Sequence, residues 1–249
     1  MTEIEEMEPE EPSSDKQLDL MEHLAELRSR LFRCIIYIAL GAIVGWVFYP
    51  FFFEVLSGPV KPVLKGSSKF LLTSVLEGFS IKMQVSLLVG AIVAMPLITM
   101  EGWSFISPGL TKKERRGVRL VAPLSILLFI AGVVLAYFVL PAGIRWLVSQ
   151  NPPGATFMPS VAQTLLFVLK MCLAFGVVFQ LPVVLMFLGK VGIVNSRMLK
   201  SYWRQAVVVL AIIAALVTPS ADAFSMMMMC VPMVILYGLS ILLVKVVER

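Results

Sequence analysis

The chain has 249 residues, 59% of them hydrophobic, with a mean hydropathy of +0.90 and a formal net charge of +5. A soluble domain of this length needs far fewer apolar side chains to fill its core, so the composition excludes an ordinary soluble protein and predicts a single integral membrane domain. The positive charge comes from basic residues gathered in alternate connections, which makes it poor support for nucleic-acid binding.

An acidic segment comes first in the chain. Residues 1–19 are poor in apolar side chains, so we predict a disordered tail there and one membrane domain over residues 20–249. A cleaved secretory signal is not expected, because the first apolar run begins only at Leu31 and is long.

The tail leads into an amphipathic helix with the sequence MEHLAELRSRLFR. Its leucines recur at helical spacing, and its charged side chains fall on another face. Glu26 and Arg30 stand four residues apart in the favourable order, so a solvated, self-paired face contributing about 0.2–0.5 kcal/mol explains them without any ligand. His23, the only histidine of the chain, is equally well explained as an interfacial residue near the lipid headgroups.

Six apolar stretches follow. The first four can each cross about 30 Å of hydrocarbon with roughly 20 residues. The fifth has 13 residues before Pro219, which gives roughly 20 Å of helix and makes this span short. A tight connection makes the fifth and sixth spans antiparallel neighbours, and the short fifth span favours local thinning of the bilayer. The stretches cover residues 31–53, 83–100, 120–140, 165–188, 206–218 and 223–244.

Basic residues accumulate on every second connection. Of the 21 Lys and Arg, 15 fall on the N-terminal segment, the second loop, the fourth loop and the C-terminus. Because Lys and Arg resist translocation, this bias predicts that both termini and the loops 101–119 and 189–205 are cytoplasmic. The connections 50–80 and 141–163, rich in Pro and Gly, are expected to form ordered caps on the opposite side.

Several chemistries find no support in the sequence. A serine-type membrane protease needs a base near its nucleophile, and the only histidine lies on the approach to the first span. The sequence has no G-x-x-x-x-G-K-[ST] phosphate loop and no cluster of His, Cys and carboxylates with metal-ligand spacing. We therefore expect no enzyme, no cofactor and no metal site, and we interpret Cys34, Cys172 and Cys230 as small apolar residues.

Carboxylates outside the N-terminal segment are rare. Ten of the 16 Asp and Glu lie in the first 26 residues, so each of the others needs a reason. Glu114 stands in the basic sequence LTKKERR, where a salt bridge with Arg115 or Arg116, or a helix-start carboxylate, is the plain alternative to a functional role. Asp222 is predicted to be an N-cap that accepts hydrogen bonds from backbone N–H groups in the first turn of the sixth span.

Five ordered segments carry a resemblance to a known family. They are MEHLAELRSRLFR before the first span, EGFSIKMQV opening the second, WSFISPGLTKKERR in the second loop, FGVVFQLPVV in the fourth span and TPSADAFSMMMMCVP at the last hairpin. Together, over about residues 20–245, they resemble TatC, the large multispanning subunit of the twin-arginine protein translocase. The resemblance implies an all-α integral membrane protein with six transmembrane helices in a glove-shaped bundle and both termini in the cytoplasm.

The same resemblance implies a function. The chain would be the signal-peptide receptor and core component of the translocase, which exports folded proteins across the bacterial cytoplasmic membrane with the protonmotive force. The implied partners are twin-arginine signal peptides, single-span subunits of the TatA and TatB type along spans five and six, other copies of the chain, and the lipid bilayer. No nucleic acid is expected among them.

The family's signal-binding carboxylates match Glu26 and Glu114 of this sequence. Each arginine of the signal offers a planar fork that a carboxylate accepts bidentately, which a lysine cannot reproduce. Two carboxylates would therefore receive two arginines, and pairs with neighbouring arginines can coexist with this role in the resting state. The surrounding cytoplasmic patch implied by the resemblance consists of Arg28, Phe105, Arg115 and Arg116.

One position departs from the family. Where the family usually has a glutamate in the fourth span, in a pattern F-E-x-P, this chain has Gln180 in FQLP. An amide keeps the hydrogen bonding but does not titrate, so we predict a docking point for a polar residue of a partner helix and not a proton carrier. Lys170 is a second unusual polar group in the fourth span and a second candidate docking point. The alternative is that its side chain only extends outward to place its charge at the membrane surface. Pro59, in SGPV, resembles a family position in the first external loop. The alternative interpretation is that Pro59 is an ordinary proline in a turn.

Two other classes of protein stay open. A secondary transporter or channel for a small solute usually shows repeated halves, broken helices or paired intramembrane charges, and none is evident in the sequence. A purely structural scaffold for a membrane complex would bind no signal peptide. Crosslinking of a twin-arginine precursor to the chain separates all three classes.

Overall fold

The computed structural model describes residues 14–63, 70–72, 74–106, 112–152, 158–218 and 222–248. Over these residues the regular structure is helical, apart from one isolated parallel bridge between Leu71 and Ser160, which confirms the all-α fold class. The helices are α1 (Ser14–Val47), α2 (Tyr49–Ser57), α3 (Glu77–Ile106), α4 (Lys112–Ser149), α5 (Val161–Val178), α6 (Leu181–Lys190), α7 (Ser196–Ser201), α8 (Trp203–Val217) and α9 (Ala223–Val247).

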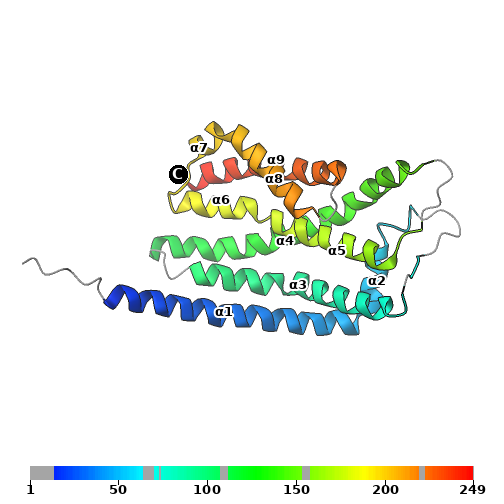
Figure 1. The fold of residues 1–249 in the computed structure, drawn as a ribbon. Helices are drawn as coiled ribbons and strands as arrows, with labels where there is room; N and C mark the ends of the chain where they lie inside the picture. The colour runs from blue at the N-terminus through cyan, green and yellow to red at the C-terminus, as the bar shows by residue number, and fades with distance from the viewer. Residues whose placement is uncertain are drawn as a thin grey trace, which may run out of the picture.

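The long helices lie side by side and alternate in direction (Figure 1). Helix α1 packs mainly on α3, α4 packs on α5, and the hairpin of α8 and α9 is joined to the rest mainly by the packing of α9 on α6. The start of α1 and the end of α9 lie at one end of the molecule, which we call the terminal end, and α2 lies at the other, which we call the α2 end (Figure 1). The side of the membrane that each end faces stays a prediction from the charge bias.

Among the residues that the structure describes, five helical segments are long and apolar enough to cross a membrane, by length and composition. Helix α8, with 15 residues, is shorter and apolar, which confirms the short fifth stretch predicted from the sequence. Helix α9 has 25 residues, so only the first leg of the last hairpin is short. The five longer segments are His23–Val47, Glu77–Phe105, Ala122–Ser149, Val161–Lys190 and Ala223–Val247.

The first helix differs from the prediction at both ends. It begins at Ser14, inside the segment 1–19 that the sequence assigns to a disordered tail, and residues 1–13 lie outside the described part of the chain. It stops at Val47, and α2 starts two residues later with Pro50 in its first turn. Proline has no N–H to continue a helix, so the end of the predicted first span, up to residue 53, forms a separate short helix.

The fourth span is broken, which the sequence analysis did not predict. Helix α5 ends at Val178 and α6 begins at Leu181, with Pro182 in its first turn. Pro182 has no N–H to donate to the carbonyl four residues earlier, and the N–H of Gln180 bonds the carbonyl of Val177 at 3.0 Å instead of continuing the α-helical pattern. The interpretation of the sequence as having no broken helix was therefore wrong.

Glycines bring α1 and α3 into backbone contact. A methyl group added at Gly41 would lie 2.6 Å from the carbonyl oxygen of Gly90, and one added at Gly45 would lie 2.8 Å from that of Ser86. Both distances are far shorter than a carbon–oxygen contact allows. Small residues at such crossings let membrane helices approach closely and gain dispersion energy along their length.

The buried core is centred on α5. Leu165, Val168, Met171 and Phe175 are at most 1% exposed, and Met229 of α9 joins them at 0%. By contrast, α1 and α8 leave large apolar side chains exposed along their length. Apolar surface on this scale is incompatible with water and fits contact with lipid or with other membrane helices, as expected for a multi-pass membrane protein.

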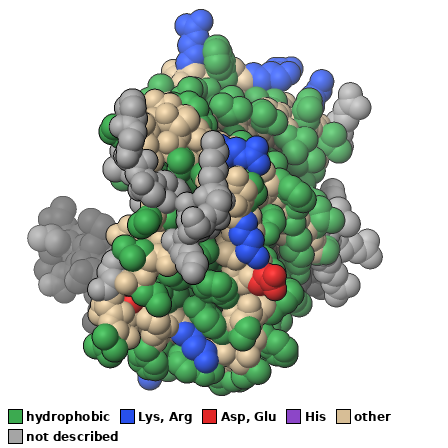
Figure 2. Space-filling model, turned by 90° about the vertical axis from the view of Figure 1, so that its right-hand side faces the viewer, with side chains coloured by type: hydrophobic (Ala, Val, Ile, Leu, Met, Phe, Trp, Pro, Cys, Tyr) green, Lys and Arg blue, Asp and Glu red, His purple; other side chains and the backbone are tan. Residues whose placement is uncertain are grey.

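At the α2 end, segments from two predicted external connections are joined. The N–H of Leu71 donates to Pro159 at 3.1 Å, and the N–H of Val161 donates to Leu71 at 3.2 Å. The Oγ of Ser160 donates to Glu77 at 3.0 Å. Figure 2 shows this end of the molecule, where charged side chains are sparsely set among hydrophobic ones.

The glycine contact makes a testable prediction. Gly41→Ala should destabilise the protein by about 1–3 kcal/mol, because the new methyl group meets backbone atoms of α3 that cannot rotate away. Gly102→Ala is the matched control, since it lies in α3 with open space around its Cα. Thermal unfolding of both variants in detergent measures the difference. Equal melting temperatures for the two variants would contradict the close packing of α1 on α3.

Candidate functional site

A group of charged side chains lies at the terminal end, between α1 and α3. Arg30 donates from Nε and Nη2 to one oxygen of Glu26, at 3.0 and 2.6 Å, and from Nη1 to Glu101 at 2.8 Å. Arg33 lies 3.5 Å from the other oxygen of Glu101, and the hydroxyl of Tyr37 donates to that same oxygen at 3.3 Å. We call these five residues the carboxylate–arginine cluster.

The helical repeat accounts for the cluster. Glu26, Arg30, Arg33 and Tyr37 stand at intervals of four, three and four residues, which places them on one stripe of α1. Glu101 comes from the last two turns of α3, whose close packing on α1 brings it against that stripe. The two helices thus join charges that are 71 residues apart in sequence.

Burial makes the cluster more than a surface ion pair. The side chain of Glu101 is 13% exposed and that of Arg30 18%, whereas that of Glu26 is 34% exposed. Removing one partner from a largely buried ion pair leaves an uncompensated charge, so these side chains hold one another in place. Glu26 is the most accessible carboxylate of the cluster and the one best placed to receive an outside ligand.

Glu101 is the residue that the sequence analysis missed. It appears there only as part of the loop 101–119, with no role assigned. The signal that could have found it is its position, as an isolated carboxylate at the end of a long apolar run, where a charge needs a partner. Its partner could not be read from the sequence, because Arg30 and Arg33 belong to another helix.

Aromatic rings flank the cluster. The ring of His23 stacks on Phe105 with centroids 4.4 Å apart and an interplanar angle of 18°. The structure therefore brings Phe105, predicted for the cytoplasmic patch, beside the first turns of α1 that carry Glu26. Arg28, also predicted for the patch, is exposed and lies over the ring of Phe32, with its guanidinium carbon 5.9 Å from the ring centroid.

The other half of the predicted site lies at the start of α4. Helix α4 begins at Lys112, and in Figure 1 its start lies at the same end of the molecule as the last turns of α3. The side chains of Glu114, Arg115 and Arg116 are outside the described part of the structure. Their participation in the site stays a prediction.

Gln180 takes part in a polar network within the chain. Its Oε1 accepts from the Oγ of Ser125 at 2.7 Å, and its Nε2 donates to the carbonyl of Ser125 at 3.0 Å and to that of Gly176 at 3.5 Å. The indole N–H of Trp103 donates to the same Oγ at 3.2 Å. The network ties α3 and α4 to the break between α5 and α6.

This network changes how Gln180 is interpreted. Its amide makes hydrogen bonds inside the molecule, so it contributes to the packing of three helices in the isolated chain. No signal in the sequence indicates this role, because Ser125 and Trp103 are unremarkable in their own segments. Docking of a partner helix on Gln180 stays a prediction.

The remaining predicted residues occupy separate places. Asp222 caps α9 by accepting from the N–H of Ser225 at 2.7 Å, which confirms the predicted N-cap. Pro59 is buried in the turn after α2, and Lys170 is exposed on α5. Neither belongs to the carboxylate–arginine cluster. Among the residues searched in the described structure, no group of three or more His, Cys, Asp or Glu could hold a metal ion.

Comparison with known proteins gives one consistent result. The family described as Sec-independent protein translocase protein (TatC) matches residues 22–232. Among curated relatives, the Sec-independent protein translocase protein TatC of Desulforapulum autotrophicum is 38% identical over 222 residues, which are 89% of this chain and 82% of the relative. The protein of the same name from Aquifex aeolicus is 35% identical over 237 residues, covering 93% and 97%.

A solved structure agrees in fold as well as in sequence. It is described as the crystal structure of twin arginine translocase receptor TatC, and it superposes with a TM-score of 0.79 at 35% identity. The match covers 91% of this chain and 100% of that chain. The common fold therefore includes the helices that carry the carboxylate–arginine cluster.

The Gln180 network generates a prediction about stability. Gln180→Leu should cost about 1–3 kcal/mol, because it leaves the Ser125 hydroxyl and carbonyl without this partner in an apolar environment. Chemical unfolding in detergent measures the loss, and Ser125→Ala supplies the second variant of a double-mutant cycle. A coupling of about 0.5 kcal/mol or more is expected for residues in contact, and strictly additive effects would contradict the network.

Proposed function

The chain belongs to the TatC family of Sec-independent protein translocase proteins, and we propose that it receives the twin-arginine signal peptides of folded precursors at its carboxylate–arginine cluster. Membership makes it a component of the twin-arginine translocase and a multi-pass membrane protein. The binding of signal peptides, and its location at the carboxylate–arginine cluster, are what we propose.

The observation that carries the proposal is the pairing of Glu26 with Arg30. Glu26 already accepts a guanidinium, with both hydrogen bonds on one oxygen, so its position and surroundings suit an arginine ligand. A carboxylate offers about four acceptor positions, so Glu26 has capacity for further donors. The internal pair occupies the site as a signal arginine would.

Arg30 has a second partner, which makes exchange feasible. When a signal arginine takes Glu26, Arg30 keeps its 2.8 Å bond to Glu101 and is not left as an uncompensated charge. Because Arg30 stays paired with Glu101, the new pair between the signal arginine and Glu26 contributes to binding. The second arginine, which we assign to Glu114, and apolar contacts of the signal add to the affinity.

The chemistry also accounts for selection of arginine over lysine. A guanidinium presents several N–H donors in a planar fork, so it can bond one carboxylate bidentately. An ammonium is a compact and strongly hydrated point charge, and it loses more on entering a partly buried site. A site built from two carboxylates therefore favours a pair of arginines.

The other parts of the proposal rest on the fold and the charge bias. We infer that the terminal end faces the cytoplasm of a bacterial cell and that the α2 end faces the opposite side of the inner membrane. The apolar part of the signal then enters the bundle, and the protonmotive force drives transport without any catalytic step by this chain. Other copies of the chain and the TatA- and TatB-type subunits complete the translocase.

Docking of the single-span subunits is assigned to the hairpin of α8 and α9. Helix α8 has 15 residues, so it spans about 23 Å and favours a thinned bilayer around it. It exposes a row of apolar side chains that includes Ile212 at 55% and Leu216 at 79% exposure. Short partner helices would match this thinned region at a lower mismatch cost.

A small-solute transporter is the second candidate, and one observation favours it. Transporters often place their substrate site at a broken helix near the middle of the membrane, and α5 and α6 form such a break. Here, however, the amide of Gln180 bonds Ser125 and Gly176, and the break is packed against α3 and α4. We therefore prefer the signal-receptor function.

The first functional prediction concerns the two carboxylates. Glu26→Gln or Glu114→Gln should weaken precursor crosslinking roughly tenfold or more, since each removes a charge-assisted bond of about 1.5–3 kcal/mol. Glu54→Gln is the matched control, because Glu54 is a 78% exposed carboxylate at the α2 end that pairs only loosely with Lys61, at 3.6 Å. Site-specific crosslinking of a twin-arginine signal in membranes with matched protein levels gives the measurement.

The same experiment contains the decisive comparison. A twin-lysine signal should crosslink weakly to the unsubstituted chain, and the double variant Glu26→Lys, Glu114→Lys should bind neither signal. If these residues serve only as internal salt bridges, their substitution changes stability by less than about 1 kcal/mol and leaves signal binding intact. Undiminished, arginine-selective crosslinking in the double variant would refute the site.

The second functional prediction concerns orientation. Reporters fused after Lys113 and after Lys200 should report the cytoplasm, and reporters fused after Ser67 and after Pro153 should report the opposite side. The physical reason is the resistance of Lys and Arg to translocation, which acts on the loops that hold most of them. A cytoplasmic signal at Pro153 would remove the six-span topology.

A further inference from the structure

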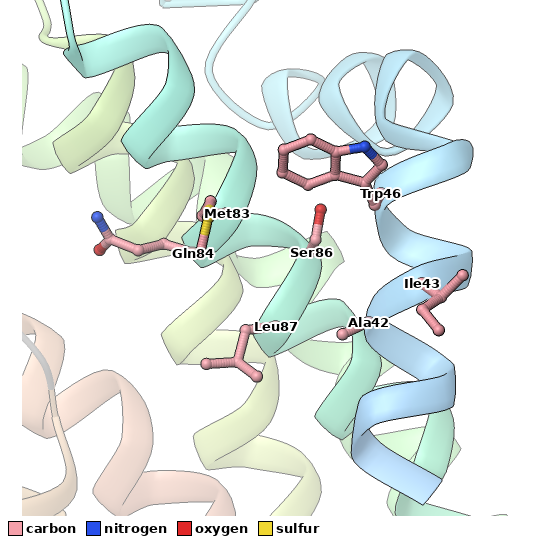
Figure 3. Close-up of a pocket in the computed structure, with 7 residues that line it drawn as sticks. All are labelled: Ala42, Ile43, Trp46, Met83, Gln84, Ser86 and Leu87. Atoms are coloured by element: carbon pink, nitrogen blue, oxygen red, sulfur yellow. The ribbon is translucent and has the colours of Figure 1, made fainter. Parts of the chain in front are cut away.

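An open groove runs between α1 and α3 toward the α2 end (Figure 3). Its volume is about 400 Å³. Three of the side chains that line it are strongly exposed, namely Ile43 at 61%, Met83 at 52% and Leu87 at 56%. The groove therefore opens onto the apolar outer surface of the molecule. Its lining consists of Ala42, Ile43, Trp46, Met83, Gln84, Ser86 and Leu87.

The groove follows from the glycine contacts of the two helices. Gly41 and Gly45 of α1 bring the helix backbones together at Gly90 and Ser86 of α3. Side chains next to these contacts, such as Ile43 and Met83, extend past the line of contact on either side, and the space between them stays open. Because the helices are already in backbone contact, they cannot close this groove by moving together.

A cation stands beside the groove. The Nζ of Lys82 lies 4.2 Å from the centroid of the Trp46 ring, which lines the groove, and 5.9 Å from the Tyr49 ring. Over the described residues, no carboxylate lies within 4.0 Å of this ammonium group. Aromatic rings stabilise a cation through their quadrupole, but they do not neutralise its charge.

The surroundings of Lys82 indicate what would neutralise it. Trp and Tyr are the side chains that concentrate at the level of lipid headgroups, and Lys82 lies between one of each. An unneutralised lysine in such a position attracts an anion. The apolar groove that starts at the same Trp46 ring suits a hydrocarbon chain.

A polar group in the groove wall lacks a partner in the described structure. Ser86 is 3% exposed, and its hydroxyl makes no hydrogen bond there. In Figure 3 this hydroxyl is directed toward the indole of Trp46. The groove thus has a buried hydroxyl at Ser86, a second polar side chain at Gln84, and a cation, Lys82, beside its Trp46 ring.

We propose that this groove binds an acidic phospholipid of the leaflet at the α2 end. Its phosphate pairs with the ammonium group of Lys82, and one acyl chain lies along Ile43, Met83 and Leu87. The charge of Lys82 favours the acidic headgroup over a zwitterionic one. The site is independent of the carboxylate–arginine cluster, which lies at the opposite end of α1 and α3.

Native mass spectrometry tests the proposal on the purified full chain in detergent. The probes are dioleoylphosphatidylglycerol, which is acidic, and dioleoylphosphatidylcholine, which is zwitterionic. The unsubstituted chain should retain phosphatidylglycerol in preference, and Lys82→Gln should lower its retention about fivefold, as expected for one lysine acting on an acidic lipid. Lys82→Arg, which keeps the charge, should retain it.

Matched variants separate this site from general charge effects and from folding. Lys170→Gln removes another lysine from a membrane helix and should leave lipid retention unchanged. Ile43→Trp fills the exposed groove without touching Lys82, so it should reduce phosphatidylglycerol retention while the melting temperature stays the same. It decides the question even where Lys82→Gln fails to fold.

Three results would overturn the proposal. The first is equal retention of the two lipids by the unsubstituted chain. The second is an equal loss of phosphatidylglycerol in Lys82→Gln and in Lys170→Gln. The third is retention of phosphatidylglycerol by Ile43→Trp at the level of the unsubstituted chain. A photo-crosslinker at Leu87 that captures a protein helix in membranes, instead of lipid, would also assign the groove to a protein partner. Glu26→Gln should not change lipid retention, so failure of the signal-receptor function leaves this test unaffected.

Discussion

Hydrocarbon offers no hydrogen-bond partners, and this constraint explains most of the molecule. Backbone groups must bond within the chain, which makes helices the available element, and polar side chains must find partners across helix contacts. Arg30 with Glu101 and Gln180 with Ser125 are such partners, each joining segments far apart in sequence. Where no carboxylate among the described residues neutralises a cation, as at Lys82, we infer a ligand.

The break between α5 and α6 shows how the constraint operates on the backbone. Pro182 cannot donate, and the helical hydrogen-bond pattern stops at Gln180, whose side chain then reaches the carbonyl of Gly176 at 3.5 Å. Its other bonds, to Ser125, hold the break against α4. An amide at this position therefore supports the bend as well as the packing of neighbouring helices.

Features that depend on neighbouring residues in sequence could be predicted, and features that depend on another helix could not. The shortness of α8 could be predicted from the 13 residues of the apolar stretch before Pro219. The Asp222 cap could be predicted from its position three residues before Ser225, whose N–H it accepts. The break at Pro182 did not follow, since Pro96 and Pro232 lie inside unbroken helices of the same chain. The role of Glu101 needed knowledge that α3 packs on α1, and that packing depends on glycines whose partner helix is not visible in the sequence.

Helix α3 connects the features described above. Glu101, Trp103 and Phe105 lie within five residues of one another, and they contact Arg30, Ser125 and His23 in that order. The end of α3 is thus held by the carboxylate–arginine cluster and also by the network at the α5–α6 break. When a signal arginine takes Glu26, Glu101 would be left as the carboxylate partner of Arg30, two residues from Trp103 in α3. The proposed binding event therefore acts on the same helix end that packs the middle of the bundle, which gives a physical route from signal recognition to the membrane interior.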